Sequence, residues 1–408
     1  MSYIRSGQTI WTANAVHSSL ARPLLTDIDC EVLVIGGGVS GALIAHRLAL
    51  HGADVVIVDR AQPSSGSTAA CTALIQYDLD QPLIEVARQH SLAEAQIAYR
   101  ACHVALDELQ EHTKEFHDRL KFHPRSSVLL ARKSRDEKPM RKEMDARNAI
   151  GIDVKWATEE ELKSEWNINA PAGMISARSM ELDPYALANC MLEKAVELGA
   201  KLLGPVEVIW DEAITDPDAK FQTIHTTHGP AIHAKYIVVA TGYQTPAYVR
   251  DHFGKLVSTW AACSKPVADL DRVWPNRQLI WQWGPSYLYA RTTLDQRVIF
   301  GGGDRGFKDA ASRDDLTEKT IASLTKQINE LVPGLSVEPE FKWSGTFGET
   351  PDGMPYIGCI KDRPGVYFAL GFGGNGVTFS TIAARIIANT ICPREDVSEL
   401  AEVFGFDR

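Results

Sequence analysis

Three glycines near the start of the chain are spaced so that they could hold the phosphates of a dinucleotide. Gly36, Gly38 and Gly41 follow a G-x-G-x-x-G pattern directly after the apolar run 31–35. The first glycine allows a tight turn, the second lets the backbone approach a pyrophosphate, and the third lets a helix pack closely on a strand. The positive end of that helix would then face the phosphates. The pattern therefore predicts a dinucleotide site.

The residues around these glycines predict the elements that position them. The run 31–35 is typical of a buried parallel strand, 39–51 has apolar residues at helical spacing, and 54–58 is typical of a second strand. The second strand leads into Asp59, whose carboxylate could accept hydrogen bonds from both adenosine ribose hydroxyls. A glycine-rich turn alone would be weak evidence, but these parts in this order favour dinucleotide binding. They do not distinguish NAD from FAD.

A second strand–glycine–helix unit lies near the other end of the chain. A strand is predicted at 366–370, a glycine-rich turn at 371–376 and an apolar helix at 377–389. A domain that binds only NAD has no need of this unit, whereas the longer FAD needs contacts at both ends. The turn and the helix start could offer N–H donors to the flavin's pyrimidine oxygen. The alternative is a helix cap with packing glycines.

Composition limits the class of protein. The 408 residues suffice for two domains, and the formal charge of -10 argues against nucleic acid or an anionic membrane surface as partner. Seven cysteines without a C-x-x-C pair indicate reduced thiols in a cytoplasmic compartment and no metal site. We find no signal peptide and no long uninterrupted apolar run, so we expect no membrane span.

The middle of the chain has a different pattern. Short strands without intervening helices between 256 and 303 predict an antiparallel sheet, and hence a second domain. The charged run 132–147 is typical of a solvent-exposed helix face. We therefore expect an α/β chain (α+β in two domains), with a Rossmann-like domain and a domain built on an antiparallel sheet.

Five motifs together resemble the D-amino-acid oxidase, glycine oxidase and sarcosine oxidase family of FAD enzymes. The arm before the first strand is similar to that of γ-glutamylputrescine oxidoreductase-like members. The motifs are VIGGGVSG with Asp59, GST at Gly66–Thr68, ATG at Ala240–Gly242, TPDGMPYIG at Thr350–Gly358 and ALGFGGNGVTFS at Ala369–Ser380.

The resemblance implies non-covalent FAD and oxidation of a C–N bond in a small amine or amino acid. A hydride passes to the flavin, water hydrolyses the imine, and oxygen or another acceptor takes the electrons. It also implies a substrate domain whose antiparallel sheet roofs the flavin. The expected segments are an arm at 1–29 that packs over the first domain, an FAD-binding domain at 30–100, 155–255 and 335–392, a substrate domain at 101–154 and 256–334, and a tail at 393–408.

The same resemblance assigns residues to FAD. The ADP half would contact the first glycine turn and Asp59, the adenine would meet the backbone of Val206, and Ser67 and Thr68 would lie near the pyrophosphate and flavin. The full set is Gly36, Gly38, Val39, Ser40, Gly41, Asp59, Arg60, Ser67, Thr68, Val206, Thr241, Gly242, Gly371, Gly373, Gly374, Asn375, Gly376 and Val377.

On the substrate side, the family's active-site tyrosine falls on Tyr287. Strand alternation puts Tyr287, Tyr289 and Arg291 on one face, where Arg291 could bind a carboxylate bidentately. The alternative is an exposed strand face with a surface arginine.

The chain departs from the family at the places that bind an α-carboxylate. Phe347 and Gly374 stand where glycine oxidases have arginines, so the usual clamp is absent. The substrate is then an amine with its acid group elsewhere, or one held by Arg291 instead. Glu349 could attract a cationic amine, although an exposed loop carboxylate is the commoner explanation.

Other departures concern the flavin and the electron acceptor. Gly345 and Ala70 replace the cysteine and the histidine that attach flavin covalently in two relatives. The strand 298–300 has no lysine for reaction with oxygen, so oxidase and dehydrogenase both remain open. Three alternatives stay open as well: a hydroxyl-oxidising flavoenzyme of the glycerol-3-phosphate dehydrogenase type, an NAD(P)-linked dehydrogenase, and a flavin-binding subunit without turnover.

Overall fold

A computed structural model describes residues 4–13, 20–210, 221–244, 249, 255–285 and 287–408. The chain forms two compact units, each assembled from three segments. Unit 1 comprises Met1–Asn14, Ala70–Asp183 and Lys255–Phe347, and unit 2 comprises Ala15–Ala69, Pro184–Gly254 and Gly348–Arg408.

Unit 2 contains a mostly parallel sheet of seven strands within the described residues. Five strands run parallel in the order β17-β10-β2-β3-β8, while β16 and β9 pair antiparallel with β17 and β10. Strand β2 lies in the middle of the parallel set and is apolar at successive positions, as a strand covered on both faces must be. The strands are β2 (Ile28–Ile35), β3 (Val55–Val58), β8 (Lys201–Leu203), β9 (Gln222–Ile224), β10 (Ile232–Val239), β16 (Tyr356–Cys359) and β17 (Val366–Leu370). The Rossmann-like fold predicted from the glycine pattern is confirmed.

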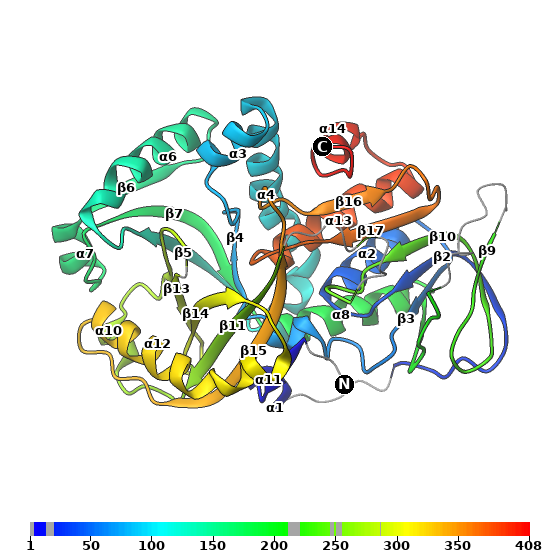
Figure 1. Cartoon of the computed structure of the whole chain (residues 1–408), viewed down its shortest axis with the longest axis horizontal. Coiled ribbons are helices and arrows are strands. Elements are labelled where there is room, and N and C mark those ends of the chain that lie inside the picture. Colours follow the sequence, from blue (N-terminus) through cyan, green and yellow to red (C-terminus); the bar gives the residue numbers. More distant parts are fainter. Residues whose placement is uncertain (1–3, 14–19, 211–220, 245–248, 250–254, 286) are drawn as a thin grey trace. The chain divides into compact units, whose positions relative to one another are not determined.

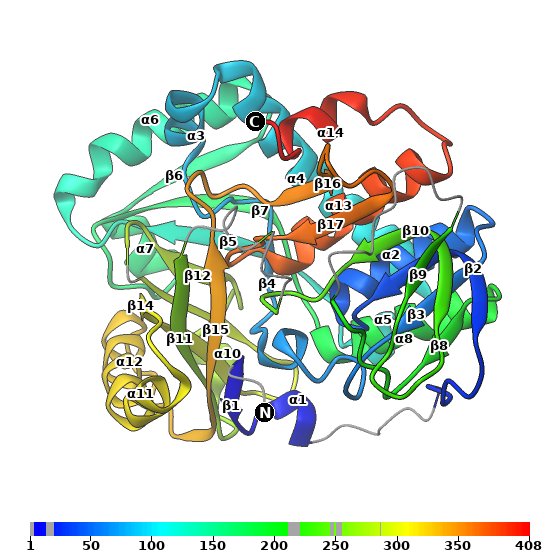
Figure 2. The same cartoon turned by 45° about the vertical axis from the view of Figure 1, so that its right-hand side comes forward.

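Helices from distant parts of the sequence pack together in unit 2. Helix α2 (Val39–Leu50) contacts both α8 (Pro184–Glu197) and α13 (Gly376–Ile391), and α14 (Ser398–Val403) follows. These helices appear beside the parallel strands in Figures 1 and 2. Helix α13 is buried over almost its whole circumference, which explains its continuously apolar sequence.

Unit 1 is organised around a sheet of ten strands within the described residues. The strand order is β1-β15-β11-β14-β13-β12-β5-β7-β4, with β6 paired to β7. Most pairs are antiparallel, and β12 with β5 is a parallel exception. The strands are β1 (Arg5–Gly7), β4 (Leu74–Gln76), β5 (His123–Leu130), β6 (Val154–Thr158), β7 (Ala172–Glu181), β11 (Lys255–Ser264), β12 (Leu279–Gln282), β13 (Leu288–Thr292), β14 (Val298–Gly306) and β15 (Pro339–Glu349).

Helix α12 (Thr317–Leu331) packs against one face of this sheet. Its buried residues join a core cluster with alternate residues of β11, β13 and β14, including Trp260, Ala290 and Phe300. The intervening residues, Tyr289 among them, therefore point to the other face. The remaining helices of the unit are α1 (Ile10–Ala13), α3 (Leu83–Gln89), α4 (Leu92–Thr113), α5 (His117–Leu120), α6 (Glu137–Ala149), α7 (Glu159–Glu165), α10 (Leu270–Val273) and α11 (Ala310–Asp315).

The segment boundaries differ from those predicted. Residues 70–100, 155–183 and 335–347 lie in unit 1 and not with the other segments predicted to bind FAD, because β4 and β6 pair with β7, and β15 pairs with β1, in the same sheet. The arm also differs, because Arg5–Gly7 pairs with β15 as strand β1 and so belongs to unit 1. Residues 1–3 and 14–19 of the predicted arm lie outside the described residues.

The charged run at 132–147 was predicted to be solvent-exposed, and this is wrong for two of its residues. Glu143 and Arg147 on α6 are 0% and 2% exposed. Arg147 pairs with Asp78, which lies far away in the sequence, and its Nε donates to Glu143 at 2.7 Å. Glu143 also accepts the backbone N–H groups of Leu83 (2.8 Å) and Ile84 (3.1 Å) at the start of α3. Burial is possible because Arg147 pairs with both carboxylates and Glu143 also accepts the free N–H groups at the start of a helix.

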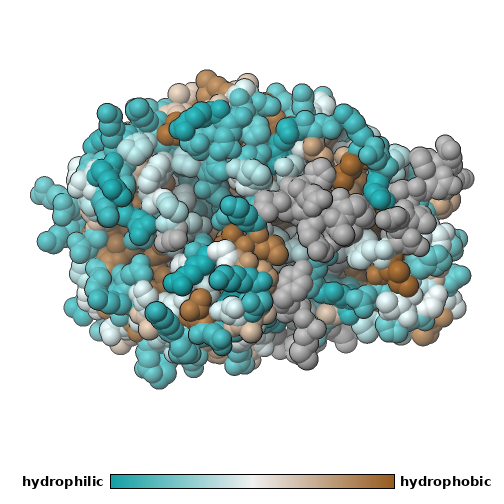
Figure 3. Space-filling view, in the orientation of Figure 1, coloured by the Kyte–Doolittle hydropathy of each residue, from teal (hydrophilic) through white to brown (hydrophobic). Residues whose placement is uncertain are grey.

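The surface is mostly polar on the face shown in Figure 3, with apolar residues in small groups. Exposed large apolar side chains, such as Leu25 and Leu92, come from separate elements, and isolated ones are normal on a protein surface. Among the described residues, every helix is too short or too polar to cross a membrane.

Candidate functional site

The first glycine turn of unit 2 has the backbone geometry of a phosphate cradle. Gly36 follows β2 with a φ of +111°, and a Cβ there would overlap the carbonyl oxygen of Ala240. A Cβ at Gly41 would overlap the carbonyl oxygen of Gly36, and one at Gly38 would lie 3.1 Å from Thr68 Oγ1. Glycine is thus required at positions 36 and 41 for the turn to close, and Gly38 keeps its backbone open to a ligand.

Hydroxyl side chains surround this turn. Val39 N donates to Thr68 Oγ1 at 2.9 Å, and Ser40 Oγ lies 2.8 Å from Ser380 Oγ on α13. Ser67 and Thr68 begin a short 3₁₀ helix, Ser67–Ala70. The hydroxyl oxygens of Ser64 and Thr241 are buried and have no hydrogen-bond partner among the described residues. Buried hydroxyls without a protein partner fit a polar cofactor that supplies one.

Asp59 lies directly beside the turn. Its two carboxylate oxygens accept Gly37 N (2.8 Å) and Ala61 N (2.9 Å). Burial raises the pKa of this carboxyl, while the two backbone hydrogen bonds oppose the shift. Val206 is buried, and its N–H donates to the Asp59 carbonyl at 2.7 Å. Arg60 is exposed and lies 3.8 Å from Glu207.

The other predicted cofactor residues converge on the same edge of the sheet. Val239 of β10 is in register with Ile35 of β2 and with Phe368 of β17, so these parallel strands end together. The turn after β10 contains Thr241 and Gly242, and the turn after β17 contains Gly371, Gly373, Gly374 and Asn375 before α13 begins at Gly376 and Val377. The carboxyl edge of a parallel sheet is where α/β proteins bind ligands.

The C-terminal glycine turn also needs glycine for its backbone. Gly371 and Gly373 have φ values of +74° and +50°. The Tyr243 hydroxyl donates to the Gly373 carbonyl at 3.4 Å, which ties this turn to the one after β10. Residues 36–41, 241–242 and 371–377 thus form one cluster of turns within unit 2.

In unit 1, aromatic side chains line the sheet face opposite α12. The ring centroids of Trp281 and Tyr287 are 6.2 Å apart, and those of Tyr287 and Tyr289 are 6.0 Å apart. The Tyr289 ring lies over Gly301, where a Cβ would overlap its hydroxyl. Burial and the nearby Asp304 carboxylate raise the pKa of Tyr289, so this hydroxyl stays protonated.

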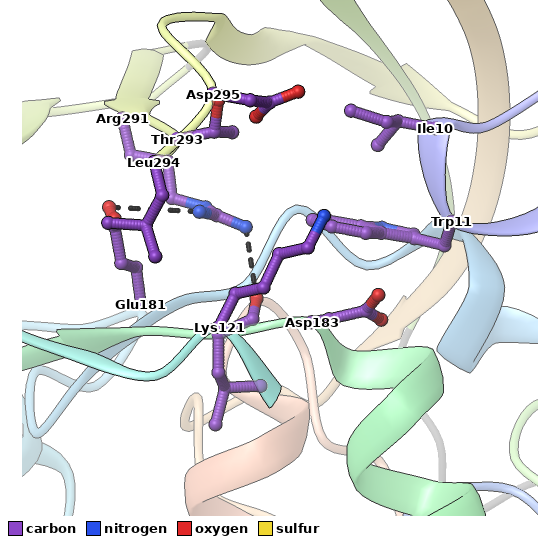
Figure 4. Close-up of a pocket in the computed structure, with 10 residues that line it drawn as sticks. Ile10, Trp11, Lys121, Glu181, Asp183, Arg291, Thr293, Leu294 and Asp295 are labelled. Carbon is purple, nitrogen blue, oxygen red and sulfur yellow. Dashed lines mark hydrogen bonds and ion pairs between the residues drawn. The ribbon is translucent and has the colours of Figure 1, made fainter. Parts of the chain in front are cut away.

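Arg291 does not end in an open site. It is 2% exposed, and its guanidinium donates to the carbonyls of Thr72 (2.7 Å), Leu182 (3.0 Å) and Thr292 (3.2 Å). Glu181 lies 3.7 Å away. Figure 4 shows the guanidinium beside Glu181 at a small pocket that also contains Trp11 and Lys121. The alternative of a surface arginine is therefore wrong. A substrate carboxylate could bind Arg291 only by displacing several of these internal hydrogen bonds.

The last two predicted substrate residues lie at the end of β15. Phe347 is half-buried and Glu349 is exposed. Sequence reasoning missed Trp11 and Trp343, whose indole N–H groups donate to the carbonyls of Cys71 (2.8 Å) and Ala70 (2.9 Å). A tryptophan gives no sequence signal for the acceptor that it will reach.

Comparison with known proteins identifies the family of the chain. The DAO model, described as FAD dependent oxidoreductase, matches residues 31–390. Glycine oxidase of Geobacillus kaustophilus is 23% identical over 390 residues, which cover 91% of this chain and 95% of the relative. Gamma-glutamylputrescine oxidoreductase of Escherichia coli is 24% identical over 388 residues, which cover 89% and 84%.

Solved structures share the fold. L-proline dehydrogenase from P. horikoshii has a TM-score of 0.74 at 22% identity and covers 90% of this chain and 94% of its own. The glycine oxidase structure from Geobacillus kaustophilus has a TM-score of 0.73 at 22% identity and covers 93% and 99%. At these identities the likeness shows the fold alone.

Proposed function

Because the chain belongs to the DAO family of FAD-dependent oxidoreductases, we propose that it oxidises a C–N bond of an amine or an N-substituted amino acid. The neutral amine loses a hydride from carbon and a proton from nitrogen, and water hydrolyses the resulting imine to a carbonyl compound and an amine. Bound FAD supplies the two-electron acceptor, and oxygen or another acceptor takes the electrons afterwards. The protein's part is chiefly to position the substrate and exclude water.

The cofactor residues proposed for unit 2 suit a non-covalently held FAD. The backbone N–H groups of Gly36–Gly41 would donate to the pyrophosphate, and the Asp59 carboxylate would accept hydrogen bonds from the ribose hydroxyls. Residues 371–377 would hold the flavin ring. The observations in support are the room that the glycines leave and the buried hydroxyls of Ser64 and Thr241.

The proposed substrate class rests mainly on the hydrogen bonds of Arg291. An α-amino acid is usually held through its carboxylate by a bidentate cation. Phe347 and Gly374 stand where the resemblance expects arginines, and Arg291 already donates to the carbonyls of Thr72 and Leu182. This supports a substrate amine without an arginine-held α-carboxylate.

The aromatic face of unit 1 is consistent with such a substrate. Trp281 and Tyr287 are partly exposed, and their rings can contact a cationic or N-alkylated group through their faces. We propose that Tyr287 and Tyr289 position the amine. Their hydroxyls are not needed as bases, because the neutral amine already carries the electron pair that drives hydride loss.

Anaerobic flavin bleaching tests the proposal. Purified holoenzyme is mixed with matched pairs that differ only in the α-carboxylate: putrescine and ornithine, cadaverine and lysine. We expect the amine of a pair to bleach the flavin at least about tenfold faster, because Arg291 already donates to the carbonyls of Thr72 and Leu182 and positions 347 and 374 hold no arginine. Bleaching by the amino acids alone would refute the substrate class. If glycerol 3-phosphate bleaches the flavin and no amine does, a hydroxyl substrate is favoured. If no compound bleaches the flavin, a non-catalytic flavin-binding subunit is favoured.

A further inference from the structure

One arginine of unit 2, Arg408, binds the loop 350–355 through several hydrogen bonds. Its Nε and Nη2 donate to the two carboxylate oxygens of Asp352 at 2.8 and 3.3 Å. Nη2 also donates to Met354 O at 2.8 Å, and Nη1 donates to Pro355 O at 2.7 Å. A guanidinium can make this set of bonds because its N–H groups point in fixed directions within one plane.

Arg408 is also held by the segment that carries it. Nη1 donates to the carbonyls of Phe404 (3.2 Å) and Gly405 (2.9 Å), and the side chain is 2% exposed. The guanidinium carbon lies 3.9 Å from the centre of the Tyr356 ring. Phe404 O also accepts Ile357 N at 2.7 Å, and α14 of the same segment lies beside β16 in Figures 1 and 2. A guanidinium fixed in this way is a rigid donor, so it fixes the loop that it binds.

Asp352 organises the loop from within. It is 8% exposed, and its Oδ1 accepts Met354 N at 3.0 Å. Gly353, between these two residues, has a φ of +72°, which glycine adopts without strain. The Asp352 carboxylate needs a cation, because a buried charge without one is strongly unfavourable. Arg408 supplies this cation, so the conformation of the loop depends on Arg408.

The loop 350–355 lies beside the glycine turn that is proposed to hold the flavin ring. Strands β16 and β17 are antiparallel, with Tyr356 opposite Leu370. The loop leads into β16 and the turn 371–376 follows β17, so both leave the sheet at the same edge. Neighbouring strands are about 5 Å apart, so a displaced loop disturbs the turn directly.

The segment that carries Arg408 also packs on the helix that follows the glycine turn. The ring centroid of Phe404 lies 6.4 Å from that of Phe379, which is in the first turn of α13. Phe379 in turn lies 6.1 Å from Phe372, which belongs to the glycine turn. All three rings are buried, so the segment contacts the surroundings of the turn on two sides.

Resting on the FAD site proposed above, we infer that Arg408 is a positioning residue for the flavin end of that site. It holds the loop 350–355 in place beside the turn 371–376 through the Asp352 carboxylate and two backbone carbonyls. All of these residues belong to unit 2. Residues 398–408, predicted to be a tail, then form a part of the site that receives the flavin ring.

Substitutions that keep the charges balanced test this role. Arg408→Lys keeps a cation beside Asp352 and removes the planar set of N–H groups. Asp352→Asn combined with Arg408→Gln removes both charges, so no buried charge is left alone. Arg385→Lys is the matched control, because Arg385 also binds both oxygens of a carboxylate, that of Glu395, through Nε (3.1 Å) and Nη2 (2.7 Å). It lies nine residues after Gly376 on α13, about 13 Å along the helix axis.

The readouts are the dissociation constants of FAD and of ADP, measured on the full chain freed of flavin, and the visible spectrum of bound flavin. FAD would occupy the whole site, whereas ADP would occupy only the end at the first glycine turn. We expect Arg408→Lys and the double variant to weaken FAD binding about fivefold or more and to shift the spectrum, with the affinity for ADP within about twofold of wild type. Arg385→Lys should match the wild type in all three measurements.

Two results would overturn the inference. If both Arg408 variants keep the FAD affinity and spectrum of Arg385→Lys, even at a lower melting temperature, Arg408 serves only the stability of unit 2. If they weaken the binding of ADP as much as that of FAD, Arg408 acts on unit 2 as a whole and not on the flavin end. The double variant decides the matter if Arg408→Lys does not fold.

This test is separable from the fate of the proposed reaction. None of the readouts needs a substrate, so a wild-type protein that binds FAD and oxidises no amine would remove the proposed reaction and leave the comparison decisive. A wild-type protein that binds no FAD would overturn both.

Discussion

Replacing Arg147 with methionine should destabilise unit 1 strongly. Arg147 is the cation between two buried carboxylates, Asp78 and Glu143. Glu143 keeps two backbone N–H donors after the change, so most of the penalty falls on Asp78. Removing one partner of a buried ion pair costs about 3–5 kcal/mol, which for a unit of this size lowers the melting temperature by about 6–20 °C.

The assay is urea and thermal unfolding of the holoenzyme, with Arg141→Met as control. Arg141 lies on the same helix and is exposed, and its guanidinium carbon lies 3.9 Å from the centre of the Trp156 ring. Its replacement should cost less than about 1 kcal/mol. If Arg147→Met also lowers the free energy of unfolding by less than about 1 kcal/mol, the view that these buried charges stabilise one another is refuted.

The pH dependence of Arg147→Met gives a second check. Burial already raises the pKa of Asp78, and loss of the neighbouring cation raises it further. The variant's folded state then takes up a proton more readily than its unfolded state, so its stability rises as pH falls. The deficit relative to wild type should therefore be larger at about pH 8 than at about pH 5. A deficit that is constant over this range would contradict the assignment to Asp78.

Three further outcomes follow from the sites. Gly41→Ala should leave the purified protein without flavin absorbance, because the new Cβ overlaps the Gly36 carbonyl; full flavin content would disprove the close approach. Asp59→Asn should weaken FAD binding about tenfold and remove the pH dependence of this binding. In the wild type, the affinity for FAD should fall as the pH is lowered, and the fall should begin above the ordinary pKa of a carboxyl group, because burial raises the pKa of Asp59. Titrations of both proteins at several pH values check this, and parallel curves would contradict it. Tyr287→Ala should lower kcat/KM at least about tenfold with the flavin spectrum unchanged, and an unaltered kcat/KM would remove Tyr287 from the substrate site.

Local pattern was enough to predict the parallel sheet of unit 2. The spacing of Gly36, Gly38 and Gly41 and the acid at position 59 require neighbouring elements only, and the parallel strands follow from their apolar runs. The second glycine unit could be placed on the same sheet because a long cofactor must be held at both ends.

Features that depend on partners distant in the sequence could not be predicted from local pattern. Whether Glu143 and Arg147 are buried depends on Asp78, and nothing within α6 reveals it. Likewise, strand alternation places Tyr289 and Arg291 on the face of the sheet opposite α12. It cannot predict that the backbone carbonyls of residues 72 and 182 accept hydrogen bonds from Arg291. The unit boundaries moved for the same reason, since β4 pairs with β7 across about a hundred residues.

The strand order of unit 2 has a consequence for the time at which the protein becomes functional during synthesis. Strand β2 leaves the ribosome early, but its parallel neighbour β10 and then β17 are made much later, at 232–239 and 366–370. At ordinary elongation rates this is a delay of about ten seconds to about a minute, during which the nascent sheet has an open edge. Capture of FAD is therefore a late event, and a shortage of the cofactor should act on the nearly finished chain and lower the yield of folded protein.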